Sequence, residues 1–288
     1  MNIKTVAVLG AGLMGRGIAQ VSAMAGYDVI LFDPFEKAIA GAMKVIDKNL
    51  AKAVEKGKTT EEAKSEAIKK ITTTTKLEDA AKAQLVIEAV PEDLAIKLPL
   101  FEQLDKLCDK ETILATNTTS QSITEISSVT QRPDKVMGLH FFNPVHIMKL
   151  VEMVNGLETS QATYDICEAF CKSIGKETVK IKEAPGFVTS RLQAVIGNEA
   201  FNMLMEGVGS AEDIDKAVKL GLNHPMGPFE MVDFVGLDTR LKSLEYLHKM
   251  MGEKYRPCPL HVQYVKAGRF GRKVGKGVYE YDEDGKKK

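Results

Sequence analysis

The sequence predicts an α/β fold in which a doubly wound, Rossmann-type sheet is followed by an all-α C-terminal domain. Short apolar runs rich in β-branched residues alternate with longer amphipathic stretches over the first half of the chain. This alternation is typical of buried parallel strands joined by helices. A glycine-rich turn, GAGLMG, directly follows the first run. Strand-like runs stop after APGF at 184–187, and the pattern is helical from there to about residue 270.

The apolar runs define the elements expected in the first domain. Strands are expected at 5–10, 28–33, 84–90, 112–117, 135–144 and 150–154. Helices are expected at 13–26, 35–56 and 94–108. The stretch 44–76 is longer and more charged than a crossover needs, so we expect it to form an inserted helical hairpin. A boundary near Pro185 and Gly186 divides the chain into domains of 1–184 and 185–288.

Composition and charge narrow the classes of function. Lys plus Arg and Asp plus Glu both number 39 among 288 residues. This balance argues against a general nucleic-acid binder, which carries a basic excess. The chain has no apolar stretch of about 18 residues, and MNIKTVAVLGAG lacks the basic and long apolar regions of a signal peptide. We therefore expect a cytoplasmic protein that binds neither nucleic acid nor a membrane.

The cysteines point to neither disulfides nor a metal. They form no CxxC pair and no Cys/His cluster with zinc spacing. A chain of this length does not need disulfides for stability. We therefore expect reduced thiols that serve in packing, at Cys108, Cys167, Cys171 and Cys258.

The GAGLMG turn has the spacing of a dinucleotide-binding loop. Gly10 allows the tight turn, Gly12 lets a pyrophosphate approach the backbone, and Gly15 lets the following helix pack on the strand. The N–H groups at the start of that helix suit phosphate oxygens. The expected cofactor contacts in this loop are Gly10, Ala11, Gly12, Leu13, Met14 and Gly15.

Asp33 indicates which dinucleotide binds. It ends the second predicted strand, roughly 20 residues after Gly10, which is the spacing of the acid that binds the ribose 2′-hydroxyl. A carboxylate there repels a 2′-phosphate, and no Arg follows at 34–36 to bind one. The loop and Asp33 together predict NAD as the cofactor. The alternative is a chance glycine turn with a capping Asp.

Among the five histidines, His140 is the candidate for catalysis. It lies at the C-terminal end of a predicted parallel strand, where open α/β sheets bind ligands. Glu152 lies in the next apolar run, where a carboxylate is costly unless it is paired, and His140 is the simplest partner. Such a pair suits a dehydrogenase, because a His exchanges a proton with an alcohol while hydride moves to nicotinamide. The alternative is a His that only bonds a loop carbonyl.

At these and further motifs the sequence resembles the 3-hydroxyacyl-CoA dehydrogenase family, most closely its short-chain bacterial 3-hydroxybutyryl-CoA members. The resemblance covers essentially the whole chain. Its motifs are GAGLMG (10–15), EAVPEDLAIK (88–97), NTTSQSIT (117–124), GLHFFNPV (138–145), KLVEMV (149–154), PGFVTSRL (185–192), GLNHPMGPFE (221–230) and GRKVGKGVYEY (271–281). It implies that the first domain binds NAD, and that the second binds substrate and pairs into a homodimer. The implied substrate is a short acyl-CoA, acetoacetyl-CoA or 3-hydroxybutyryl-CoA.

The resemblance also implies roles for matching residues. His140 is implied as the catalytic base and Glu152 as the residue that orients it. Asn143 is implied to contact the nicotinamide half, and Asn117 and Thr119 to hold nicotinamide and thioester together. The other cofactor contacts that it implies are Glu92, Lys97 and Lys273.

Two positions depart from the commonest family pattern. Family members often read NTSS where this chain reads NTTS, so Thr119 supplies the hydroxyl in place of Ser, with a stiffer χ1. Members often have an Asn, thought to polarise the substrate carbonyl, where this chain has Ser190. Ser190 is shorter, so it acts on the substrate through a water molecule or not at all.

A row of lysines is the candidate for binding the CoA end. Lys44, Lys48, Lys52 and Lys56 recur every four residues of a predicted helix, so they share one face. Like charges at this spacing repel, so helix stability does not explain them. The phosphates of CoA suit a row of ammonium groups, and we expect Lys52 and Lys56 to contact them. The alternative is a solvated face.

Two rival functions remain. A hydroxyisobutyrate-type dehydrogenase also joins a Rossmann domain to a helical one, but it carries a catalytic Lys at the start of the helical domain. This chain has PGFVTSRL there, without that Lys. The other rival is an NAD-binding structural protein similar to those of the lens, which would not need His140 paired with Glu152.

Overall fold

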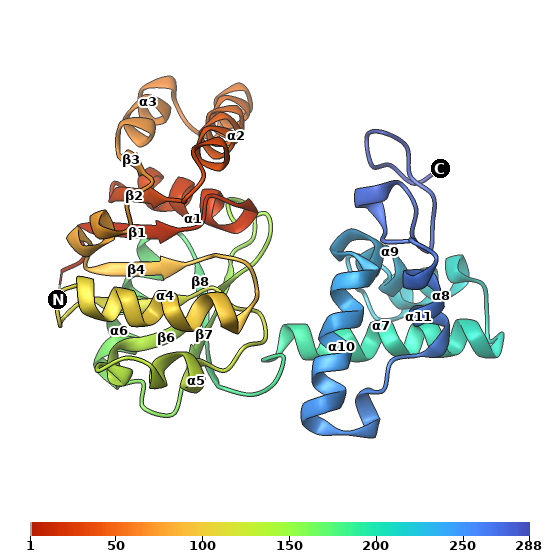
Figure 1. Cartoon of the computed structure of the whole chain (residues 1–288). Helices are drawn as coiled ribbons and strands as arrows, with labels where there is room; N and C mark the ends of the chain where they lie inside the picture. The colour runs from red at the N-terminus through yellow and green to blue at the C-terminus, as the bar shows by residue number, and fades with distance from the viewer. Residues whose placement is uncertain (1) are drawn as a thin grey trace. The chain divides into compact units, whose positions relative to one another are not determined.

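The computed structural model describes residues 2–288 and separates into two compact units, Met1–Ala184 and Pro185–Lys288. The first unit holds an eight-stranded sheet with flanking helices, and the second is built from helices (Figure 1). The predicted fold class is confirmed. Within the described part of the chain, no helix combines the length and the apolar character that crossing a membrane requires.

The sheet of the first unit has the strand order β3-β2-β1-β4-β5-β6-β7-β8. Its strands are β1 (Thr5–Leu9), β2 (Asp28–Phe32), β3 (Ile71–Thr74), β4 (Leu85–Glu88), β5 (Ile113–Thr116), β6 (Val136–Phe141), β7 (Leu150–Asn155) and β8 (Glu177–Lys182). All neighbouring strands are parallel except β6 and β7, which are antiparallel. The strand order reverses at β1 and β4, whose carboxyl ends therefore border the crevice where such sheets bind ligands.

Helices bury both faces of this sheet. They are α1 (Leu13–Met24), α2 (Glu36–Glu55), α3 (Glu61–Lys69), α4 (Leu94–Leu107), α5 (Ile123–Ser128) and α6 (Gln161–Ser173). Asp93 and Ser160 cap α4 and α6 by accepting backbone N–H groups of the first turn. Val8, Ile18 and Phe170, from β1, α1 and α6, are buried in one apolar core. All four cysteines are free and buried.

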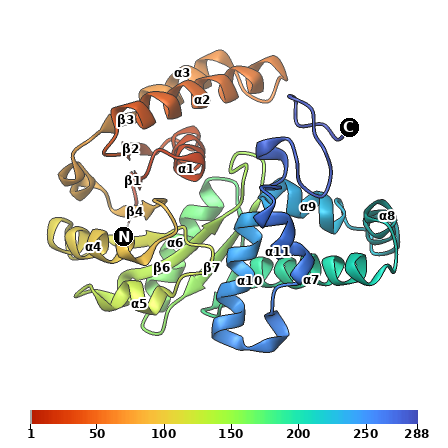
Figure 2. The same ribbon diagram turned by 45° about the vertical axis from the view of Figure 1, so that its right-hand side comes forward.

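The predicted hairpin at 44–76 is only partly helical. α2 and α3 do form a helical pair beside β3 (Figures 1 and 2). The prediction was wrong for Ile71–Thr74, which pairs in parallel with β2 as an edge strand. The other edge strand, Glu177–Lys182, was not predicted either. Each has one buried apolar residue, Ile71 and Ile181, because an edge strand exposes much of its surface to solvent, and neither therefore shows an apolar run.

The second unit consists of five α-helices and a C-terminal segment that packs back on them. The helices are α7 (Thr189–Glu206), α8 (Ala211–Gly221), α9 (Pro228–Val235), α10 (Leu237–Met251) and α11 (Pro259–Lys266). Tyr279 and Tyr281 of the C-terminal segment are buried in the same core as Phe201 and Phe229.

A buried carboxylate ties the C-terminal segment to the helices. Asp233, on α9, accepts the N–H groups of Val278 at 2.8 Å and Tyr279 at 2.9 Å. It also accepts the hydroxyl of Tyr281 at 2.8 Å. A Cβ added to Gly277 would collide with the Asp233 carboxylate. The glycine therefore allows the close approach on which these hydrogen bonds depend.

Candidate active site

The glycine-rich loop lies at the carboxyl end of β1. Gly10 has a φ of 100°, and a Cβ there would lie 2.7 Å from the carbonyl oxygen of Ala89. A Cβ at Gly15 would collide with the carbonyl oxygen of Gly10. Around Gly12, by contrast, a Cβ would meet nothing within 4 Å. Gly12 is also the N-cap of α1 and offers no side-chain cap, so the first N–H groups of α1 are open to an anion.

Asp33 holds this loop from the end of β2. Its Oδ2 atom accepts the N–H of Ala11 at 2.8 Å, and its Oδ1 atom accepts the N–H of Phe35 at 3.0 Å. The side chain is 9% exposed. A carboxylate oxygen has two acceptor positions, so both oxygens keep capacity for a hydroxyl donor.

His140 and Glu152 meet across the antiparallel strands β6 and β7. The two residues are directly opposite in the register, and Nδ1 of His140 lies 2.7 Å from Oε2 of Glu152. His140 is 5% exposed and Glu152 is fully buried. The ring of His140 also packs on Phe142, with 4.5 Å between centroids. Because a carboxylate only accepts, a neutral imidazole in this contact carries its proton on Nδ1.

A buried ionic cluster lies at the end of β4. Nζ of Lys97 is 2.7 Å from Oε1 of Glu88 and 3.3 Å from Oε2 of Glu92. Thr116 donates its hydroxyl to the other oxygen of Glu88 at 2.7 Å. Glu88 is fully buried and Lys97 is 1% exposed, so each charge depends on its partner for compensation.

Glu92 gathers the loop that carries Thr119. Its Oε1 atom accepts the hydroxyl of Thr118 at 2.5 Å, the N–H and hydroxyl of Thr119 at 2.8 and 3.1 Å, and the N–H of Ser120 at 3.2 Å. Burial acts to raise the pKa of Glu92, but Lys97 and these donors outweigh it and hold the pKa below its ordinary value. Since the Thr119 proton points at Glu92, this hydroxyl offers a ligand its lone pairs.

Asn117 connects this loop to the strand of His140. Its Oδ1 atom accepts the N–H of Phe141 at 2.9 Å. Asn143 follows β6, is exposed, and forms a cis peptide bond with Pro144. The structure thus brings the glycine loop and the polar residues at the ends of β2, β4, β5 and β6 together along the carboxyl ends of these parallel strands.

Two predicted contacts belong to the second unit. Ser190 lies in the first turn of α7. Lys273 lies in a short 3₁₀ helix, and its Nζ atom is 2.7 Å from the carboxylate of Asp238. Glu88, in contrast, was not predicted as part of the site. The sequence could have predicted Glu88, because it is a carboxylate within the apolar run QLVIEAV, just as Glu152 is within LVEMV.

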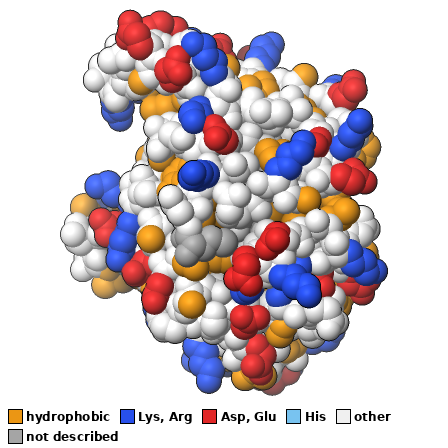
Figure 3. Space-filling model, turned by 90° about the vertical axis from the view of Figure 1, so that its left-hand side faces the viewer, with side chains coloured by type: hydrophobic (Ala, Val, Ile, Leu, Met, Phe, Trp, Pro, Cys, Tyr) orange, Lys and Arg blue, Asp and Glu red, His pale blue; other side chains and the backbone are white. Residues whose placement is uncertain are grey.

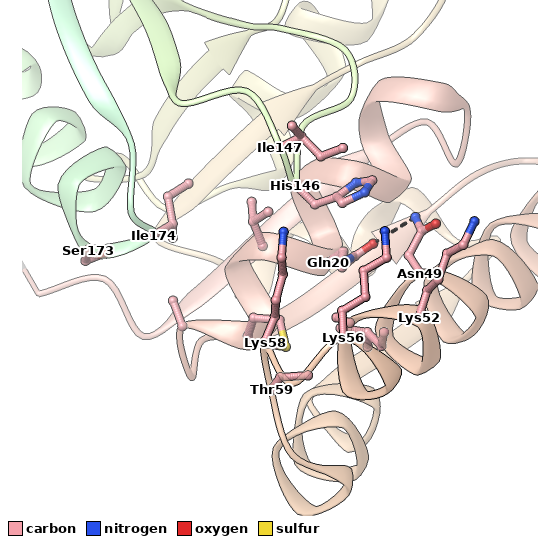
Figure 4. A pocket seen from close by; sticks show the side chains of 15 residues that line it. Gln20, Asn49, Lys52, Lys56, Lys58, Thr59, His146, Ile147, Ser173 and Ile174 are labelled. Carbon is pink, nitrogen blue, oxygen red and sulfur yellow. Dashed lines mark hydrogen bonds between the residues drawn. The ribbon is translucent and has the colours of Figure 1, made fainter.

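A separate pocket of about 690 Å³ opens between α1, α2, α6 and the loop that joins β6 to β7. Lys52, Lys56 and Lys58 line it, and their side chains extend toward that loop (Figure 4). Its apolar lining includes Val21, Met24, Leu50, Ile147 and Ile174. Lys44 and Lys48 do not line the pocket. All four lysines of the row are exposed. Figure 3 shows Lys and Arg side chains interspersed with Asp and Glu over one face of the molecule.

No group of three His, Cys, Asp or Glu side chains suited to a metal ion is found among residues 2–288. The residues at the sheet edge do fit a dinucleotide, because the open N-terminus of α1 and the carboxylate of Asp33 offer complementary ligands to a pyrophosphate and a ribose.

Known proteins share both units. Residues 5–184 match the NAD binding domain of 3-hydroxyacyl-CoA dehydrogenase, and residues 186–281 match its C-terminal domain. A probable 3-hydroxybutyryl-CoA dehydrogenase of Bacillus subtilis (strain 168) is 48% identical over 98% of this chain and 99% of that protein. A 3-hydroxybutyryl-CoA dehydrogenase of Clostridioides difficile is 47% identical over 96% of this chain and 99% of that protein.

A solved structure agrees with these matches. The crystal structure of (S)-3-hydroxybutyryl-CoA dehydrogenase from Ralstonia eutropha has a TM-score of 0.95 and 41% sequence identity to this chain. The match covers 98% of this chain and 100% of that chain. Since family models match both units, the chain belongs to the 3-hydroxyacyl-CoA dehydrogenase family of NAD-dependent oxidoreductases.

Proposed function

We propose that this enzyme interconverts 3-hydroxybutyryl-CoA and acetoacetyl-CoA with NAD, and that His140 and Glu152 handle the proton. The proposed substrate is that of the similar 3-hydroxybutyryl-CoA dehydrogenases. The proton chemistry rests on one observation, the buried contact of 2.7 Å between Nδ1 of His140 and Oε2 of Glu152. It lies at the same edge of the sheet as the glycine loop.

The pair provides general acid–base catalysis. A bound nicotinamide would supply the acceptor for the hydride from C3 of the alcohol. Nε2 of His140 takes the hydroxyl proton during oxidation and returns it during reduction. Glu152 keeps the proton on Nδ1 and stabilises the imidazolium that forms, because its carboxylate is buried beside the ring.

The cofactor is placed by the first unit. The loop of residues 10–15 would hold the pyrophosphate, and Asp33 would accept the ribose hydroxyls. Asn117, Thr119 and Asn143 contact the nicotinamide end, with Thr119 as an acceptor because its proton is engaged by Glu92. Ser190 and Lys273, in the second unit, stay predicted contacts of substrate and cofactor.

The contribution of Glu92 and Lys97 is mainly to hold the loop of residues 118–120. Lys97 is 1% exposed and contacts both Glu88 and Glu92, so its ammonium group acts through them. Glu92 is partly open, with 35% of its side chain exposed. It is therefore the member of this pair that remains available to a cofactor.

The CoA end of the substrate occupies the pocket beside α2. Lys52 and Lys56 line this pocket, and its other walls are largely apolar. None of its fifteen lining residues, all of which are described, is acidic. A pocket with ammonium groups over an apolar floor suits the phosphates and the purine ring of a nucleotide.

A homodimer formed through the second unit completes the proposal. More than half of the exposed large apolar side chains belong to this smaller unit. On α7, Leu192 and Ile196 lie one turn apart and are 57% and 39% exposed. Such apolar side chains are typical of a protein interface, and the occupant we propose is a second copy of this chain.

The test is NADH oxidation with acetoacetyl-CoA, a series of longer 3-ketoacyl-CoAs, and free acetoacetate. We expect turnover with the short thioesters and none with the free acid. Turnover of free acetoacetate without CoA would support the hydroxyisobutyrate-type rival instead. NADH binding without turnover of any thioester would favour a structural protein.

A further inference from the structure

The loop between β6 and β7 is held rigidly on two sides. Val145 is 2% exposed and packs against α1 at Gly17, where a Cβ would lie 2.8 Å from the Val145 side chain. On the other side, the buried ammonium of Lys176 donates to the carbonyl oxygen of Val145 and, at 2.8 Å, to that of Met148. These anchors hold the backbone on both sides of His146, whose side chain is exposed.

His146 faces the lysines of the pocket beside α2. Its ring lies in the same space as the ends of Lys52, Lys56 and Lys58 (Figure 4). On the remaining sides the pocket offers it Gln20 and other uncharged residues of α1 and α6. Lys176 adds a further positive charge behind the loop. The cationic neighbours of His146 therefore come from three places. They are Lys52 and Lys56 on α2, Lys58 on the turn that follows α2, and Lys176 after α6.

These surroundings disfavour a charge on the imidazole while the pocket is empty. Partial desolvation in the pocket lowers the pKa of His146 most, and the charges of Lys176 and Lys58 lower it further. The ring is accordingly neutral at pH 7, unlike the lysines around it. A bound phosphate would reverse this balance, because its negative charge offsets the neighbouring ammonium groups.

We propose that His146 is a proton-dependent phosphate ligand of this pocket, which becomes cationic when a nucleotide phosphate binds beside Lys52, Lys56 and Lys58. The ligand class is the phosphorylated adenosine end of the acyl-CoA, so the inference rests on the proposed function. The proton comes from solvent, and His146 releases it to solvent when the ligand dissociates. No covalent bond to the protein forms or breaks.

The proposal fixes the sign of a pH effect. If binding raises the pKa of His146 above its value in the empty pocket, ligand and proton bind cooperatively. The affinity then rises as the pH falls through the pKa of the complex, and it levels off below the pKa of the empty pocket. A lysine-only pocket would show no such change, since its ammonium groups stay charged over this range.

The probe is adenosine 3′,5′-bisphosphate, titrated by calorimetry into full-length protein saturated with NAD⁺. NAD⁺ keeps the probe out of the dinucleotide site. The titration is repeated in buffers of different ionisation enthalpy, which reports the number of protons taken up. His146→Gln is the test variant, and His248→Gln, which alters a half-buried histidine on α10 of the second unit, is the matched control.

We expect the wild type and His248→Gln to take up a fraction of a proton more than His146→Gln at neutral pH. The phosphate itself titrates with a pKa near 6, and the comparison with His146→Gln cancels this contribution. At about pH 6 the wild type should bind the probe about threefold to fivefold more tightly than His146→Gln, and at about pH 8.5 equally well.

Equal proton uptake by the wild type and His146→Gln would overturn the proposal while leaving the pocket as a nucleotide site. Failure of the wild type to bind the probe at either pH would overturn both the role of His146 and the placement of CoA here. Turnover of acetoacetyl-CoA tests the proposed reaction separately. Unchanged turnover of acetoacetyl-pantetheine, which lacks the nucleotide, shows that His146→Gln is folded and active.

Discussion

Nδ1 of His140 and Oε2 of Glu152 lie 2.7 Å apart, and the backbone register of β6 and β7 places the two residues directly opposite each other. A base whose partner sits on the neighbouring strand is oriented by the sheet itself. Replacing His140 with Gln should therefore lower kcat by about 10²–10⁴, the range for a general acid–base group. NADH affinity should stay unchanged by fluorescence titration. A variant with more than a tenth of wild-type turnover would remove His140 from the mechanism.

The combination of both variants tests whether Glu152 acts through His140. Glu152→Gln alone should lower kcat, because the amide does not stabilise the imidazolium as a carboxylate does. The double variant should be no slower than His140→Gln, since residues that act as a unit are not additive. Multiplied losses in the double variant would show that Glu152 has an independent role.

The second prediction concerns the buried ion pair of Lys97 and Glu88. Lys97→Met should destabilise the protein by about 3–5 kcal/mol, because it leaves a buried carboxylate without its cation. Unfolding in urea measures this loss. Adding Glu88→Gln should recover part of it. Lys69→Met, which breaks an exposed pair with Glu66, serves as the control and should hardly change the midpoint; an equally small effect of Lys97→Met would argue against a dependent pair.

The third prediction concerns cofactor choice. Asp33→Ala removes the carboxylate that accepts Ala11 N–H and would face a 2′-phosphate. We expect kcat/KM to fall with NADH and to rise with NADPH, so the preference narrows. Steady-state kinetics with both cofactors measures the change. A wild-type enzyme that already favours NADPH would contradict the role given to Asp33.

The fourth prediction separates the two halves of the lysine row. Lys52 and Lys56 line the pocket, whereas Lys44 and Lys48 do not. Changing Lys52 and Lys56 to Glu should raise the KM for acetoacetyl-CoA about tenfold, roughly 1.4 kcal/mol, and the effect should shrink with salt. The KM for NADH should barely move.

Two controls accompany this charge reversal. Changing Lys44 and Lys48 to Glu changes the net charge by the same amount outside the pocket. It should raise the KM for acetoacetyl-CoA less. Acetoacetyl-pantetheine should be used equally by all variants, because it carries no nucleotide phosphate. Loss of the truncated substrate in the Lys52 and Lys56 variant would mean that these residues support folding or the reacting centre.

The last prediction is a pH dependence of stability. His261 is 1% exposed, stacks on Phe201 at 4.6 Å between centroids, and donates from Nε2 to the carbonyl of Leu237 at 3.0 Å. Burial, only partly offset by the Leu237 bond and reinforced by the charge of Arg240, lowers the pKa of His261 to about 4. The unfolded chain therefore binds a proton that the folded protein rejects between about pH 6.5 and about pH 4.

The contribution of His261 is complete above about pH 6.5 and is lost as the pH falls toward 4. At about pH 5 the loss should be about 2 kcal/mol relative to about pH 8. Thermal unfolding of the wild type and of His261→Phe measures it. The variant should lose less stability over this range, and parallel curves for the two proteins would exclude His261 as the source.

Sequence periodicity predicted the buried elements better than the edge elements. β1, β4 and β5 are nearly continuous apolar runs because both of their faces are covered. β3 and β8, at the two edges, each bury one apolar residue, Ile71 and Ile181, and they resemble polar connections. The strand pairing of Ile71–Thr74 depends on β2, which is distant in sequence, and a local pattern does not show it.

The candidate site could be predicted from the sequence where a single residue was unusual for its surroundings. A carboxylate in an apolar run revealed Glu152, and the same argument would have found Glu88. The pocket was predictable only in part. The spacing of Lys52 and Lys56 defined one wall, but the opposite wall is the loop with His146 and Ile147, which reaches α2 only through the tertiary fold.

The attachment of the C-terminal segment bears on the order of events during synthesis. Residues 1–184 contain every strand of the sheet, so this unit has all of its partners once they have left the ribosome. The helical unit does not have all of its partners when its five helices have emerged. Asp233 on α9 is buried and accepts hydrogen bonds from Val278, Tyr279 and Tyr281 near the end of the chain. Until residue 281 emerges, that carboxylate lacks its partners. The nascent helices therefore stay incompletely packed at a stage when the first unit can already fold.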